Sequence, residues 1–133
     1  MMTHILRFSA LFGFLGVATG AFATHGLKNT LPVDLLEIFA TGSRYCLLHA
    51  LPLMAIGLSS QKENVWLQRA SLGFIIGTII FAGSLWTLAL SGLRWFGAIT
   101  PIGGLGLLYG WVCVFLSASS IQKSTDIKDS SST

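Results

Sequence analysis

The sequence predicts an all-α, polytopic membrane protein: a four-transmembrane-helix bundle with a short interfacial helix between the first and second spans. Composition is the first reason, because 53% of the 133 residues are hydrophobic and 10% are charged, whereas soluble domains have roughly 25% charged residues. The second reason is a mean hydropathy of +0.74. The third is the presence of four apolar runs, each close to the ~20 residues that a helix needs to cross a bilayer.

The runs predict spans at residues 6–26, 39–59, 69–92 and 101–119, which form a single domain over residues 1–121. Residues 122–133 are polar, and we expect a disordered tail there. The first span has a second interpretation as a cleavable signal peptide, because a basic start and an apolar run lead to Ala21-Phe22-Ala23. We expect this span to be retained, because no soluble domain follows it for export.

The connections between spans contain recognisable helix signals. The segment LPVDLLEIFA has Pro32 near its start and Asp34 and Glu37 in its first turns, and it predicts a short helix lying in the membrane interface. Further along, Gly92 suits the end of a helix, and Thr100 followed by Pro101 suits the start of the next one. We therefore expect a tight turn over residues 93–99.

The lysines and arginines predict the orientation, because cytoplasmic loops of membrane proteins carry an excess of them. With four spans, one side of the membrane has Arg7, Lys62, Arg69, Lys123 and Lys128. The other side has Lys28, Arg44 and Arg94. Both termini are therefore expected in the cytoplasm. The formal charge of +3 comes from scattered residues, which excludes a nucleic-acid-binding patch.

Small residues recur at a four-residue step in three of the spans. The pairs are Gly16 and Gly20, Gly73 and Gly77, and Gly106 and Gly110. Such GxxxG pairs allow helix backbones to approach closely in a membrane. We interpret them as helix-packing residues within the bundle, and they leave a homo-oligomer open.

Two ionisable residues lie inside the second span. If that helix begins near Phe39, Arg44 is about 7 to 8 Å along it and His49 about 15 Å along it. Arg44 can then extend its charge to the outer interface, whereas His49 is too deep to do so. Tyr45 shares a face with His49, and Pro52 leaves the carbonyl of Leu48 without its usual partner. These features predict a local polar site within the membrane.

By depth alone, the polar side chains concentrate in the outer half of the bundle. They predict an outward-facing polar pocket formed by His25, Arg44, Tyr45, His49, Ser84, Arg94, Trp95 and Thr100. A network of residues that only satisfy one another competes evenly with a functional pocket. Metal or haem ligation by His25 and His49 is an alternative, since imidazole suits several metals. Neither histidine has a further ligand at a suitable spacing, so we expect no metal and no cofactor.

Four stretches resemble one known family. They are GAFATHGL at residues 20–27, FATGSRYCLLHAL at 39–51, FAGSLWTLALSG at 81–92 and WFGAITPIGG at 95–104. In order and spacing they resemble domain-of-unknown-function family 423. It is also called uncharacterised protein family 0382, and its relatives include transmembrane protein 256. The resemblance implies a bacterial inner-membrane protein with four spans and no established biochemical activity.

The sequence contains no recognisable catalytic motif, and we expect no enzyme activity. The leading hypothesis is a structural or accessory protein that uses its outward-facing polar pocket to bind a partner protein or an anionic lipid head group. One alternative is a small transporter or channel acting as an oligomer. A second alternative is a metal, haem or quinone site that uses His25 and His49.

Overall fold

The computed structural model describes residues 2–61 and 63–130, with side chains described for residues 3–61 and 63–119, and every regular element in this part of the chain is helical. Helix α1 (Met2–Phe22) continues into a π-helical turn, η1 (Ala23–Leu27), and is followed by α2 (Val33–Leu58) and α3 (Val65–Ser91). A 3-10 turn, η2 (Arg94–Ala98), leads into α4 (Thr100–Ser130). The all-α prediction is therefore confirmed for the described residues.

Both ends of α3 have a clear chemical cause. The side chain of Asn64 accepts hydrogen bonds from the backbone N–H groups of Trp66 and Leu67, at 3.0 and 3.3 Å, and so caps the start of the helix. At the other end, Gly92 has a φ of 70° and donates its N–H to the Leu88 carbonyl. Because this left-handed conformation favours glycine, Gly92 ends α3 as the sequence predicts.

Two helix boundaries differ from the sequence expectation. The expected interfacial helix is not a separate element, because residues 33–38 form the first turns of α2 and run without a break into the rest of it. Pro32 precedes this helix, and no glycine or proline follows before Gly42, so nothing stops it. Likewise, α4 continues to Ser130, beyond the expected end at residue 119, while residues 131–133 lie outside the described residues.

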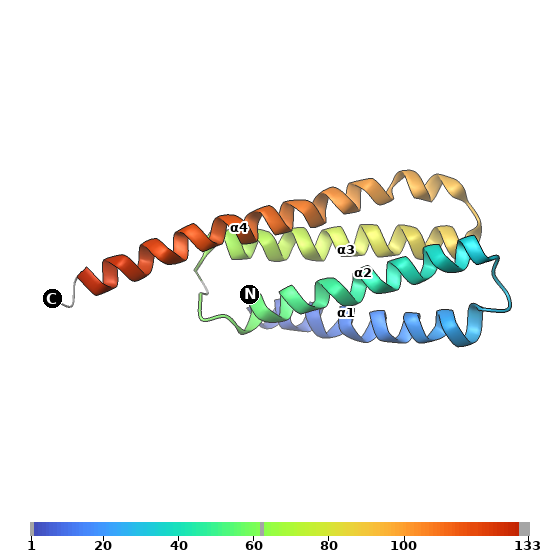
Figure 1. Ribbon diagram of the computed structural model, residues 1–133, viewed down its shortest axis with the longest axis horizontal. Coiled ribbons are helices and arrows are strands. Elements are labelled where there is room, and N and C mark those ends of the chain that lie inside the picture. Colours follow the sequence, from blue (N-terminus) through green and yellow to red (C-terminus); the bar gives the residue numbers. More distant parts are fainter. Residues whose placement is uncertain (1, 62, 131–133) are drawn as a thin grey trace.

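The helices run antiparallel to one another and lie side by side in chain order (Figure 1). Each packs extensively against its neighbour in sequence: α1 against α2, α2 against α3, and α3 against α4. No extended α1–α4 interface closes the described helices into a ring. The arrangement is an open row with two ends. We call the end near both chain termini the terminal end, and the end with η1 and η2 the distal end.

Facing glycines bring α3 and α4 together. A Cβ atom built on Gly73 would lie 2.9 Å from the Gly106 carbonyl oxygen, and one on Gly77 would lie 2.7 Å from the Leu107 backbone nitrogen. A Cβ on Gly110 would meet the Phe74 ring at 2.6 Å. Real Cβ atoms do not approach this closely, so the two backbones touch only because side chains are missing here.

The α1–α2 contact uses fewer small residues. A Cβ on Gly16 would collide with the Leu47 backbone, whereas Gly20, its GxxxG partner, has nothing within 4 Å of such an atom. Ser9 adds a hydrogen bond from its hydroxyl to the Ala50 carbonyl at 2.9 Å. Of the glycines predicted to pack helices, Gly20 is therefore the one that faces open space.

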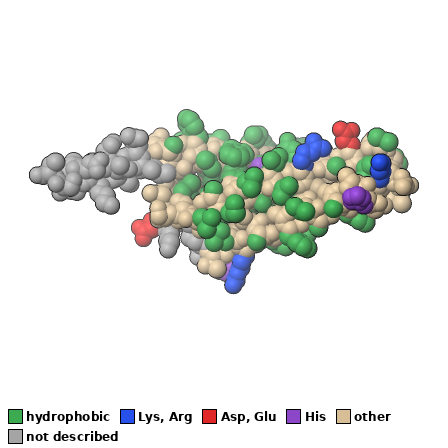
Figure 2. Space-filling model, turned by 60° about the horizontal axis from the view of Figure 1, so that its bottom comes forward, with side chains coloured by type: hydrophobic (Ala, Val, Ile, Leu, Met, Phe, Trp, Pro, Cys, Tyr) green, Lys and Arg blue, Asp and Glu red, His purple; other side chains and the backbone are tan. Residues whose placement is uncertain are grey.

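Hydrophobic side chains are spread over the visible face of the described residues, with few charged side chains among them (Figure 2). By length and composition, three stretches are long and apolar enough to cross a membrane: Thr3–Leu27, Val65–Ser91 and Arg94–Ser119. Many large apolar side chains on these helices are exposed, such as Phe14 at 71% and Phe115 at 77%. Such a surface suits lipid rather than water.

We expect Gly77→Ala to destabilise the α3–α4 contact, because the added methyl group would press on the Leu107 backbone. Overpacking of this kind costs about 1 to 3 kcal/mol. The free energy of unfolding can be measured by titrating purified protein in detergent with sodium dodecyl sulfate and following circular dichroism. Gly20→Ala is the matched control, and it should leave stability unchanged or slightly raised. Equal losses in both variants would contradict the proposed role of the glycine contact.

A second expectation concerns the hydrogen bond between the Ser84 and Thr100 hydroxyls, which joins α3 to α4 at 2.8 Å. A double-mutant cycle with Ser84→Ala and Thr100→Val should give a coupling energy near the ~0.6 kcal/mol average for hydrogen bonds between membrane helices. The same unfolding titration measures it. Strictly additive losses would mean that the hydroxyls do not stabilise each other.

Candidate functional site

The side chains expected to form one polar pocket lie in separate places. Tyr45 and His49 are in contact on α2, with ring centroids 5.9 Å apart, and Ser84 is bonded to Thr100 across α3 and α4. The other members are exposed: Arg44 next to Tyr45 on α2, His25 in η1, and Arg94 and Trp95 in η2. Of the eight residues, Tyr45 and His49 line one cavity together, and the other six are not among its lining residues.

The distal end carries two of the separated residues. Arg94 lies 3.9 Å from the Asp34 carboxylate, and both side chains are mostly exposed, so the pair contributes little to stability. Trp95 is 59% exposed and stacks on Phe96 with ring centroids 4.0 Å apart. These residues form the surface of the connection between helices and do not enclose a site.

Arg44 lies deeper along its helix than the sequence suggested. Because α2 begins at Val33 rather than near Phe39, Arg44 is about 16 Å from the start of the helix, at 1.5 Å per residue. Its side chain is exposed. Among the described residues, no carboxylate or hydrogen-bond acceptor pairs with its guanidinium. Arg44 is thus an unpaired charge near the middle of α2.

His49 has the opposite environment, because it is only 5% exposed. Its ring lies among aromatic side chains, with centroids 5.5 Å from Phe74 and 6.3 Å from Trp111. Nδ1 lies 2.9 Å from the backbone carbonyl oxygen of Tyr45. This contact fixes the ring, since the carbonyl lies one turn earlier on the same helix.

The second ring nitrogen of His49, Nε2, has a different environment from Nδ1. Nε2 forms no hydrogen bond to any described residue. Among described residues, the only fully enclosed side-chain nitrogen or oxygen without a partner is Oγ1 of Thr78. Nε2 is therefore not fully enclosed, and His49 is one of the residues that line a neighbouring cavity.

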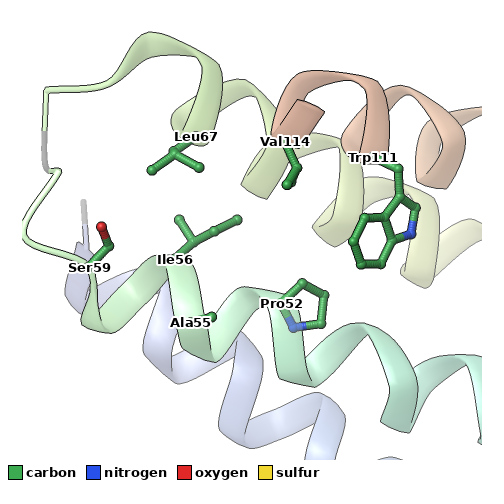
Figure 3. Close-up of a pocket in the computed structure, with 7 residues that line it drawn as sticks. All are labelled: Pro52, Ala55, Ile56, Ser59, Leu67, Trp111 and Val114. Carbon is green, nitrogen blue, oxygen red and sulfur yellow. The ribbon is translucent and has the colours of Figure 1, made fainter. Parts of the chain in front are cut away.

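That cavity is a groove of about 490 Å³ between α2 and α4, with α3 beneath it. It is lined by Tyr45, His49, Phe81, Pro101, Gly104, Leu105, Leu107, Leu108 and Trp111. A second hollow of about 320 Å³ continues on the other side of Trp111, toward the terminal end. In Figure 3 its lining from α2, including Pro52 and Ile56, faces Trp111 and Val114 of α4. The two hollows together form what we call the α2–α4 groove.

Depth along the helices did not reveal the aromatic residues of this groove. Phe81 lies 4.6 Å from the Tyr45 ring, and Phe74 lies 5.1 Å from the Trp111 ring, between centroids. The sequence does hold a signal for α4, since Gly104, Leu108 and Trp111 follow a spacing of four and three residues and share one helix face. The sequence alone does not show that this face of α4 contacts His49.

The histidines do not form a common metal site. His25 is exposed in η1, beside the cluster that contains Ala23 and Phe39. His49 is ten residues further along α2 than Phe39, a rise of about 15 Å. Within the described residues there is no group of three or more potential metal ligands. His25 and His49 therefore lie too far apart to ligate a single metal ion together.

Comparison with known proteins gives a consistent family. Residues 19–104 match the family model described as a protein of unknown function, DUF423. The UPF0382 inner membrane protein YgdD of Escherichia coli K12 is 34% identical over 120 residues, which cover 90% of this chain and 92% of that protein. A UPF0382 membrane protein of Staphylococcus saprophyticus is 37% identical, again over 120 residues, which cover 90% of this chain and 100% of that protein.

A third relative, a UPF0382 membrane protein of Haemophilus influenzae, is 38% identical over 112 residues, which cover 84% of this chain and 90% of that protein. No solved structure matches the chain. The relatives' names agree with the apolar helices in describing membrane proteins. On both the family model and these identities, the chain belongs to the DUF423, or UPF0382, family of membrane proteins, whose function is uncharacterised.

Proposed function

We propose that this chain is a non-catalytic accessory protein of the inner membrane that crosses the bilayer four times and holds an acidic partner at Arg44. Helix α2 is not one of the three stretches that are apolar enough by composition to cross a membrane. Its crossing is proposed from its length and its place in the row. At 26 residues, α2 is about 39 Å long, more than the ~30 Å hydrocarbon thickness. It also lies between α1 and α3 in the row, which supports a shared membrane depth.

The orientation follows from the same row. Both termini lie toward one end (Figure 1), and the sequence segments nearest that end carry most of the lysines and arginines. Because an excess of these residues marks the cytoplasmic side, the terminal end faces the cytoplasm in this proposal. The distal end, with Asp34 and Arg94, then faces outward.

This topology makes a direct prediction for labelling. A cysteine placed at Asn29, in the loop between η1 and α2, should react in intact cells with a thiol reagent that cannot cross the membrane. Cysteine at Ser60, in the loop before α3, should react only after the cells are opened. Cys46 and Cys113 are buried and should contribute little background. The reverse pattern would show that the protein has the opposite orientation. Equal labelling of both sites would show that α2 does not cross the membrane.

Arg44 supports the binding part of the proposal. A charged residue at the centre of a membrane helix costs about 2.5 to 3.5 kcal/mol on insertion scales, and such residues pair with an opposite charge. Glu37 is the nearest acidic residue on α2, but it is seven positions away, about 10 Å along the helix. An anionic group from outside the chain would remove this cost.

The depth of Arg44 favours a carboxylate on a partner helix over a lipid head group. Lipid phosphates lie at the interface, whereas Arg44 is about 16 Å from the distal start of α2. A second copy of the chain is a poor partner on this face. In a two-fold dimer with the axis along the membrane normal, each Arg44 would lie at the same depth as the other, so like charges would meet. The partner proposed is therefore a different membrane protein with an acidic residue in a span.

The test is retention of bound proteins by tagged protein purified from native membranes in mild detergent. We expect Arg44→Gln to reduce the principal co-purifying membrane protein at least about tenfold, equivalent to about 1.4 kcal/mol. Arg94→Gln is the matched control, because that arginine is exposed and paired with Asp34 at the distal end, and it should keep the partner. Unchanged recovery with Arg44→Gln would overturn the proposal. Loss of a bound anionic lipid instead of a protein would do the same, and would point to a head group.

A further inference from the structure

The α2–α4 groove is separate from the Arg44 surface and has its own chemistry. Arg44 does not line it, because a five-residue step turns Arg44 and His49 about 140° apart on the helix. The part that holds His49 has about 490 Å³, within the ~300 to 1,000 Å³ of small-molecule sites. Two of its lining residues, Leu105 and Leu108, are mostly exposed, so a ligand dissolved in the lipid can reach the groove.

The hydrogen bond to Tyr45 decides what His49 offers to this groove. A backbone carbonyl oxygen only accepts hydrogen bonds, so the 2.9 Å contact requires the proton on Nδ1. In the neutral ring the other nitrogen, Nε2, then carries a lone pair and no proton. The groove therefore presents a hydrogen-bond acceptor, and its complement is a ligand with a hydroxyl or N–H group.

The walls around this acceptor favour a flat ring. Tyr45, Phe81 and Trp111 line the same part of the groove as His49, and aromatic faces and edges pack well against another aromatic ring. On this side Gly104 leaves room, because a Cβ atom there would meet only the Phe81 ring, at 3.8 Å. The lining beyond Trp111 is mostly apolar, with Pro52, Ala55 and Ile56 from α2, and it suits a hydrocarbon chain.

We propose that the α2–α4 groove binds a lipid-soluble aromatic alcohol, of the alkylphenol or quinol class, whose hydroxyl donates a hydrogen bond to Nε2 of His49. The ring lies beside Tyr45 and Phe81. The alkyl chain passes Trp111 and occupies the hollow drawn in Figure 3. The hydroxyl is the part that makes the site selective, since a plain acyl chain would leave Nε2 unpaired.

The experiment compares two probes: a phenol, whose hydroxyl can donate a hydrogen bond, and its methyl ether, in which a methyl group replaces that hydrogen. Full-length protein in lipid nanodiscs is titrated with para-decylphenol and with its methyl ether, para-decylanisole, and bound probe is measured by equilibrium dialysis against empty nanodiscs. We expect the phenol to bind about tenfold or more tightly, as one hydrogen bond to an otherwise unpaired buried group allows. Equal binding of the two probes, or no saturable binding of the phenol, would overturn the proposal.

Nitrogen-15 NMR tests whether the hydroxyl of the probe donates its hydrogen bond to His49. In protein labelled with nitrogen-15 at histidine, the phenol should shift the Nε2 resonance of His49, while the resonances of His4 and His25 stay in place. His49→Phe keeps an aromatic ring but removes the acceptor, so the difference between the two probes should disappear. His25→Phe is the control for the change itself, because His25 is exposed in η1. A preference that survives His49→Phe would contradict the assignment.

A second variant fills the groove without touching His49. Gly104→Leu should weaken both probes at least about tenfold, because the new side chain enters the space beside Phe81. Gly20→Leu introduces the same side chain on α1, where a Cβ meets nothing within 4 Å, and should leave binding unchanged. If Gly104→Leu binds both probes normally while remaining folded, the ligand lies elsewhere. The Arg44 partner assay is unaffected by these outcomes, so the two proposals fail independently.

Discussion

The close approach of α3 and α4 is the constraint on which the rest of the described structure depends. In hydrocarbon, burial from water does not draw two helices together, so contact between backbones has to hold them. Gly73 and Gly77 meet Gly106 and Leu107 at distances that leave no room for a side chain. This contact fixes how far α4 is shifted along α3. It thereby puts Trp111 beside Phe74 and gives the α2–α4 groove one of its walls.

The helices form an open row because only the two middle helices, α2 and α3, pack against two neighbours each. Each middle helix packs against two neighbours, as Cys46 of α2 contacts Phe12 of α1 while His49 contacts Phe74 of α3, whereas α4 buries a single stripe that includes Gly103, Leu107 and Cys113. With one buried stripe each, α1 and α4 have no further face with which to close a ring. In a closed bundle His49 would need a protein partner for its second nitrogen. In the open row, His49 instead lines a groove between α2 and α4.

The sequence predicted the helices well because their limits are encoded locally. Gly92 ends α3 through its backbone conformation, and α4 begins at Thr100, directly before Pro101. The start of α2 was misjudged because the acids Asp34 and Glu37 suggested a boundary between an interfacial helix and a membrane span. A helix does not need to break where its polarity changes, and the backbone from Val33 to Leu58 contains no break.

The candidate site was predicted less well, because depth along a helix does not say which way a side chain points. Arg44 and His49 lie within about 8 Å of each other along the axis of α2, and depth alone grouped them. Their directions separate them: His49 is buried against Phe74 and Trp111 with Nδ1 bonded to a carbonyl, and Arg44 is exposed. Direction becomes known only when the neighbours of the helix are known, and those depend on contacts between distant glycines.

In the proposed membrane crossing of α2, Arg44 and His49 are held in two different ways. For His49, the helix itself satisfies one nitrogen and the aromatic neighbours enclose the ring, so the remaining need is a single hydrogen bond. For Arg44, no described residue supplies the opposite charge, and the cost of burying a guanidinium in hydrocarbon is larger than that of one unmade hydrogen bond. A partner outside the chain would therefore relieve a larger free-energy cost at Arg44 than at His49. The single hydrogen bond at His49 would be the more selective of the two interactions.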